Sequence, residues 1–147
     1  METERMPSIY LASRYGRREE MLSNARLLVS LGYRVTSRWV EGGHEMKDEA
    51  SSSEELRRFA DEDLNDLREA DILLAFTESP GDVPGRARGG RWVEFGFALA
   101  TGKIVVVVGY RENVFCHLSH VGHLSFLSPI GLRALWQRHQ ALDKEKP

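Results

Sequence analysis

The chain has almost no cysteine, no long apolar run and no excess of charge of one sign. Cys116 is the only cysteine among the 147 residues, so an internal disulfide is excluded and a reducing cytoplasmic setting is expected. No apolar run approaches the roughly 18 residues of a membrane-spanning helix. The charged N-terminal stretch lacks the apolar core of a signal peptide. We therefore expect a cytoplasmic protein with no membrane partner.

The balance of charge excludes another class of partner. There are 20 basic and 22 acidic residues, for a net charge of −2. Domains that bind DNA or RNA are usually clearly basic, so no nucleic acid polymer is expected as a partner. The hydrophobic fraction of 41% suffices for one core at this length, and we interpret residues 1–147 as a single domain.

Several ligand motifs are also missing. Neither GxGxxG nor a Walker pattern occurs, so there is no dinucleotide or triphosphate fingerprint. His117, His120 and His123 recur at every third position, but this spacing matches no standard zinc motif. We therefore expect no metal site and no organic cofactor.

Short apolar runs alternate with helical patterns along the chain. Strands are predicted at residues 8–12, 33–40, 72–76, 104–108 and 124–127. Helices are predicted at residues 17–31, 53–69, 92–100 and 129–142, with Ser52 and Glu55 as a capping box before the second. This alternation indicates an α/β fold with a parallel sheet of about five strands, covered by helices on both faces.

The segments between these elements indicate where a ligand binds. Residues 41–53 are polar and aperiodic, and residues 77–90 carry glycine and proline, so both are interpreted as loops. Ligands of parallel sheets bind at the C-terminal ends of the strands. We therefore expect the site among residues 13–18, 77–90 and 109–113.

Glu94 is the most informative single residue. It is the only charged side chain in the stretch 92–100, and it follows Gly89 and Gly90, which places it in the first turn of the predicted helix. The helix dipole favours an ionised carboxylate there, and such a carboxylate in apolar surroundings can act as a nucleophile. The alternative is a glutamate that faces solvent or a subunit interface.

Asp63 is the second anomaly. It lies four residues after Phe59 and four before Leu67, and so on the apolar face of its predicted helix, whereas Asp66 is assigned to a solvated face. A buried carboxylate needs a partner. The alternative is an aspartate at the edge of the face that caps a neighbouring backbone.

Two further groups are candidates. Tyr10 lies in the first predicted strand, where its hydroxyl needs a partner, although simple core packing also explains it. Ser13, Arg17 and Arg18 follow that strand at a helix start, and they form either a phosphate site or a solvated basic helix terminus.

The residues 63–76 and 91–109 together resemble the nucleoside 2-deoxyribosyltransferase family. The resemblance rests on a strand with Tyr10, on Asp63 before the third strand, and on the sequence Glu94-Phe95-Gly96-Phe97-Ala98 before Gly102-Lys103. It covers roughly residues 8–118. It implies a flavodoxin-like or Rossmann-like three-layer sandwich, and a homodimer or a larger homo-oligomer.

The resemblance also implies roles for these residues. Glu94 would attack C1′ of the sugar and form a glycosyl ester, Asp63 would assist the departing base, and Tyr10 would orient the nucleophile. Ser13, Arg17, Arg18, Gly89 and Gly90 are expected to bind the substrate, and Asn113 is expected to enter a neighbouring subunit's site. Members transfer 2-deoxyribose between bases or hydrolyse nucleoside 5′-monophosphates.

Two departures from the family pattern affect the expected substrate. The loop before Glu94 is expanded and carries Arg86, Arg88 and Arg91. Arginine pairs well with phosphate, which favours a phosphorylated nucleoside. The alternatives are a non-catalytic nucleotide-sensing module and a nucleoside monophosphate phosphoribohydrolase, whose PGGxGT pattern is absent here.

Overall fold

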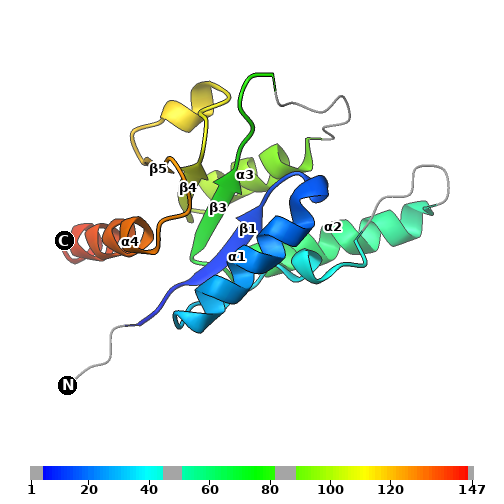
Figure 1. Ribbon diagram of the computed structural model, residues 1–147, viewed down its shortest axis with the longest axis horizontal. Coiled ribbons are helices and arrows are strands. Elements are labelled where there is room, and N and C mark those ends of the chain that lie inside the picture. The colour runs from blue at the N-terminus through cyan, green and yellow to red at the C-terminus, as the bar shows by residue number, and fades with distance from the viewer. Residues whose placement is uncertain (1–4, 45–50, 82–88, 146–147) are drawn as a thin grey trace.

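A parallel sheet of five strands lies at the centre of the protein (Figure 1). The computed structural model describes residues 5–44, 51–81 and 89–145. Parts of the two predicted loops, with Arg86 and Arg88, lie outside these residues. The strand order is β2-β1-β3-β4-β5, which confirms the predicted fold class. The strands are β1 (Ser8–Ala12), β2 (Arg34–Val35), β3 (Ile72–Phe76), β4 (Ile104–Val108) and β5 (Val121–Leu124).

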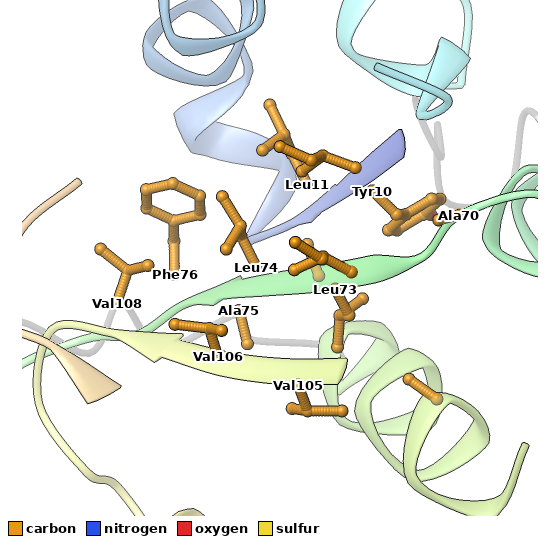
Figure 2. Close-up of a cluster of buried hydrophobic side chains, with 14 of the residues drawn as sticks. Tyr10, Leu11, Ala70, Leu73, Leu74, Ala75, Phe76, Val105, Val106 and Val108 are labelled. Atoms are coloured by element: carbon orange, nitrogen blue, oxygen red, sulfur yellow. The ribbon is translucent and has the colours of Figure 1, made fainter. Parts of the chain in front are cut away.

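Helices cover both faces of the sheet. The α-helices are α1 (Arg18–Ser30), α2 (Ser53–Arg68), α3 (Gly90–Ala100) and α4 (Pro129–Lys144), and the 3₁₀ helices are η1 (Tyr15–Arg17), η2 (Arg38–Glu41) and η4 (Val114–His117). The connection from β1 to β2 runs toward one edge of the sheet, and the connections from β2 to β3 and from β3 to β4 run toward the other edge. Because crossovers between parallel strands are right-handed, α1 lies on one face of the sheet and α2 and α3 lie on the other. In Figure 2 the side chain of Leu11 points toward α1, and that of Val105 points toward α3.

The register of the strands defines the two halves of the core. Tyr10 pairs with Leu73, which pairs with Val105, and this row faces α3. The adjacent row of Leu11, Leu74, Val106 and Gly122 faces the opposite layer. Leu135 of α4 lies 3.4 Å from where a Cβ of Gly122 would stand, so the missing side chain lets α4 approach β5 closely.

The predicted second strand is wrong in its length. Residues 33–40 were expected to be extended, but β2 covers only Arg34–Val35 and η2 follows. The indole of Trp39 donates to the carbonyl of Leu11 at 2.8 Å, and Asp66 accepts from the backbone N–H of Arg38 at 3.0 Å. These two contacts with distant elements turn the chain out of the sheet at its edge.

The predicted last strand is displaced. The strand expected at residues 124–127 lies at Val121–Leu124, where Val121 pairs with Val105 and Leu124 with Val108. Phe126, which lies inside the predicted range, is 71% exposed. Ladder pairing with β4 therefore decided the position of this strand. Among the described residues, no helix combines the length and the apolar composition that crossing a membrane requires.

Candidate active site

Glu94 projects from α3 toward the sheet. The helix begins at Gly90, two residues before the predicted start, so Glu94 lies in its second turn rather than its first. The dipole argument for an ionised carboxylate is correspondingly weaker, because that effect is confined to the first turn. Arg91 and Ala98, one turn before and after Glu94, are buried, and Glu94 itself is partly buried on the same face.

Tyr10 provides the partner of Glu94. Its side chain is fully buried in the middle of β1, and its hydroxyl donates a hydrogen bond to Oε2 of Glu94. Every residue of β1 is buried, and Tyr10 belongs to the row that faces α3. The strand therefore holds a rigid phenol at a fixed position beneath the carboxylate.

Burial dominates the proton affinity of this pair. Loss of solvent raises the pKa of Glu94 to about 8, the hydrogen bond from Tyr10 opposes this rise, and the charge of Asp63 adds to it. Burial and the charge of Glu94 raise the pKa of Tyr10 well above its usual value. The phenol therefore keeps its proton and acts only as a donor.

Asp63 belongs to the same site. It lies on α2 between buried Phe59 and Leu67, on the inner face as its spacing predicts, and its side chain is 29% exposed. Burial raises its pKa to about 6. Its charge raises the pKa values of both Glu94 and Tyr10, so the three groups share one electrostatic environment.

Asp66 corrects a prediction. It was assigned to the solvated face of α2, but it is only 4% exposed. It accepts from the backbone N–H of Arg38 at 3.0 Å and from the guanidinium Nε at 2.8 Å. The pair could not be found from the sequence, because it forms only after η2 has folded against α2.

His44 adjoins the candidate site and was missed by the sequence analysis. It follows two glycines in a polar segment without periodicity, so no pattern marks it. Its Nε2 lies 2.6 Å from Oε2 of Glu62 and 3.9 Å from Oδ1 of Asp63. The histidine is thus a direct neighbour of one of the two candidate carboxyl groups.

The residues expected to bind phosphate contact protein partners. The Ser13 hydroxyl donates to the carbonyl of Arg14, and Arg18 donates to the carbonyl of Val40 at 3.0 Å. Arg17 binds Glu20 through two nitrogens, at 2.7 and 2.8 Å, and its third nitrogen donates to the carbonyl of Thr77. Their role toward a substrate stays a prediction.

Gly89, Gly90 and Asn113 lie at the same edge of the sheet. Gly89 precedes α3 in the left-handed conformation with φ of 80°, and both glycines are exposed. Oδ1 of Asn113 accepts from the backbone N–H of Phe115 at 3.0 Å and caps η4. A contact of Asn113 with a neighbouring subunit remains a prediction.

Arg91 links the ends of two strands. Its side chain is 8% exposed, and it donates to the carbonyl of Phe76 and contacts Glu112, both at 2.9 Å. Its guanidinium also lies over the ring of Trp92. Burial lowers the pKa of this guanidinium, and the charge of Glu112 opposes that effect. These contacts make Arg91 a structural link beneath the N-terminus of α3.

The sequence pattern of one known family extends over this whole arrangement. The nucleoside 2-deoxyribosyltransferase pattern matches residues 9–126, which include Tyr10, Asp63 and Glu94. The chain belongs to this family. The resemblance noted in the sequence is thereby confirmed, and the enzymes of this family act on nucleosides.

The chain is also similar to solved structures, and the first of them shares its fold. One is a 2-deoxyribosyltransferase from the psychrotolerant bacterium Bacillus psychrosaccharolyticus, with 21% identity and a TM-score of 0.61. That similarity covers 85% of this chain and 95% of the other. A conserved protein from Enterococcus faecalis V583 is more distant, with 15% identity, a TM-score of 0.47 and coverage of 90% and 88%. A search of curated proteins gives no match.

Proposed function

We propose that the protein cleaves the N-glycosidic bond of a 2′-deoxynucleoside, a nucleoside or its 5′-monophosphate through a covalent glycosyl-Glu94 intermediate. The observation that carries this proposal is the hydrogen bond from buried Tyr10 to Glu94, beside a second carboxyl group on Asp63. A carboxylate nucleophile and a separate acid are the two groups that retaining glycosidases use.

The first step forms an ester and releases the base. An oxygen of ionised Glu94 bonds to C1′ of the sugar, the bond from C1′ to the base nitrogen breaks, and its electron pair leaves with the base. Protonated Asp63 supplies the proton that the departing nitrogen needs. In the second step, water or the nitrogen of another base bonds to C1′, the ester bond from C1′ to Glu94 breaks, and its electron pair returns to the Glu94 carboxylate. Ionised Asp63 takes up the proton that the attacking group loses.

The two pKa values set how often the reactive form occurs. Asp63 with a pKa of about 6 and Glu94 with a pKa of about 8 hold one proton between them over that pH range. The higher pKa of Glu94 places that proton mainly on Glu94. The reactive form, with the proton on Asp63 and a charge on Glu94, is therefore the less populated of the two one-proton forms. Below about pH 6 both groups are protonated and the nucleophile is lost, and above about pH 8 both are ionised and the acid is lost.

Tyr10 favours the reactive form. Its hydrogen bond stabilises the ionised form of Glu94, and so shifts the shared proton toward Asp63. No metal or organic cofactor enters this scheme, and the proposed partner is a small nucleoside or nucleotide.

Base release tests the proposal. The protein and its Glu94→Gln variant are incubated with a panel of nucleosides, deoxynucleosides and their 5′-monophosphates, with and without a free acceptor base. Release in water alone, lost in the variant, identifies a hydrolase, and exchange that needs the acceptor identifies a transferase. Binding without turnover on any substrate contradicts the proposal and supports a nucleotide-sensing module instead.

A further inference from the structure

His44 is buried although it lies in a polar segment. Its side chain is 10% exposed, and its ring packs on Phe59 with 4.9 Å between the ring centroids. Phe59 belongs to the inner face of α2, one helical turn before Asp63. The ring is therefore held against the part of the helix that carries the candidate acid.

The ring nitrogens of His44 have unused hydrogen-bonding capacity. Nε2 lies 2.6 Å from Glu62 and 3.9 Å from Oδ1 of Asp63. Three buried atoms, Nδ1 and Nε2 of His44 and Oδ1 of Asp63, have no partner in hydrogen-bond geometry among the described residues. Leaving such groups unpaired is costly, and hydrogen bonds of active sites often tighten only when substrate binds.

We propose that His44 is a positioning residue for Asp63: in the working site its Nε2–H turns from Glu62 to donate to Oδ1 of Asp63, while the ring stays packed on Phe59. The inference rests on the function proposed above. With Oδ1 occupied by the histidine, the proton for the departing base is carried on Oδ2 of Asp63. One contact thus fixes both the orientation of the acid and the oxygen that acts.

The charged surroundings of Asp63 give this proposal a measurable signature. Besides His44, the titratable and charged groups that act on it are Glu62 and Asp66 of α2, Arg38 of η2, Tyr10 of β1 and Glu94 of α3. The charge of His44 lowers the pKa of Asp63, against the larger effect of burial. Removal of the imidazole therefore raises this pKa, provided that the other groups stay in place.

Two substitutions of His44 separate its roles. His44→Phe keeps a ring against Phe59 and removes both nitrogens, whereas His44→Gln keeps an N–H donor without a charge. His139→Phe is the matched control, because His139 also stacks on an aromatic ring, that of Trp136, and contacts a carboxylate, but on α4. The readouts are kcat and KM for base release, and the pKa of Asp63 from the NMR titration of its carboxyl carbon.

We expect His44→Phe to lower kcat about 10- to 100-fold with KM changed less than about threefold, as for a misplaced catalytic group. His44→Gln should recover most of kcat, and the pKa of Asp63 should rise in both variants. The His139→Phe control should match the wild type. The proposal is overturned if His44→Phe leaves both kcat and the pKa of Asp63 unchanged. It is also overturned if kcat falls and KM rises by the same factor in both variants while the pKa of Asp63 does not rise.

Failure of this inference is distinguishable from failure of the proposed function. If Glu94→Gln abolishes base release while His44→Phe behaves as the wild type, only the role of His44 is refuted. If the wild type releases no base, the proposed function fails. The titration of Asp63 then still shows whether the two side chains interact, but the positioning role is overturned together with the reaction.

Discussion

Replacing Tyr10 by phenylalanine tests the centre of the proposed mechanism. The ring is fully buried, so Tyr10→Phe keeps the packing between β1 and α3 and deletes only the hydroxyl. Oε2 of Glu94 loses the donor that stabilises its charge. Because that hydrogen bond lowers the pKa of Glu94, its loss raises this pKa above its value of about 8.

The size of the effect follows from the kind of hydrogen bond. A bond to a charged group contributes about 1.5–3 kcal/mol, which corresponds to roughly 10- to 150-fold in rate. A higher pKa of Glu94 moves the shared proton away from Asp63, so the reactive form becomes rarer at neutral pH. We therefore expect kcat/KM to fall by about that factor and the alkaline limb of its pH profile to move upward.

The assay is kcat/KM for base release between about pH 5 and pH 10 for the wild type and for Tyr10→Phe. Tyr33→Phe is the control, because Tyr33 is also buried but lies outside the segments expected to form the site. Thermal unfolding checks that all three proteins are folded. An unmoved alkaline limb together with a loss of less than about threefold would refute the reasoning.

Three further predictions concern the second carboxyl group and the fold. Asp63→Asn should lower kcat about 100-fold, because the acid is gone. Activity should then only rise with pH instead of following a bell-shaped profile, and the pKa of Glu94 should fall because the charge of Asp63 no longer raises it. A retained alkaline limb contradicts this. Gly122→Val should cost about 1–3 kcal/mol in urea unfolding, because a Cβ there meets Val106 at 3.3 Å and Leu135 at 3.4 Å. Ser52→Ala should cost about 1 kcal/mol in the same measurement, because the Ser52 hydroxyl caps α2 by accepting from the backbone N–H of Glu55 at 3.1 Å; an unchanged midpoint would show that the cap contributes nothing.

Local patterns predicted the elements that rest on local physics. The first, third and fourth strands were predicted with the bounds that they have, because each is a short apolar run buried on both faces. The cap at Ser52 was also predicted correctly, since a capping box needs only residues three apart. The inward position of Asp63 followed from helical spacing in the same way.

Elements that depend on distant contacts were predicted less well. The second strand was cut short by contacts of Trp39 and Arg38 with β1 and α2. The last strand was placed by its pairing with β4 rather than by its own apolar residues. Asp66 was misassigned because its partner, Arg38, lies 28 residues away in the chain.

The sequence by itself determined the fold class, the family and the three candidate residues, because periodicity, composition and residue order are properties of the chain. Only the tertiary structure decided how these residues interact. It brought the Tyr10 hydroxyl to Glu94 across 84 positions of sequence, and it set His44 beside Asp63. The raised pKa values of Glu94 and Asp63 arise from burial and from neighbouring charges, and these exist only once β1, α2 and α3 have packed together.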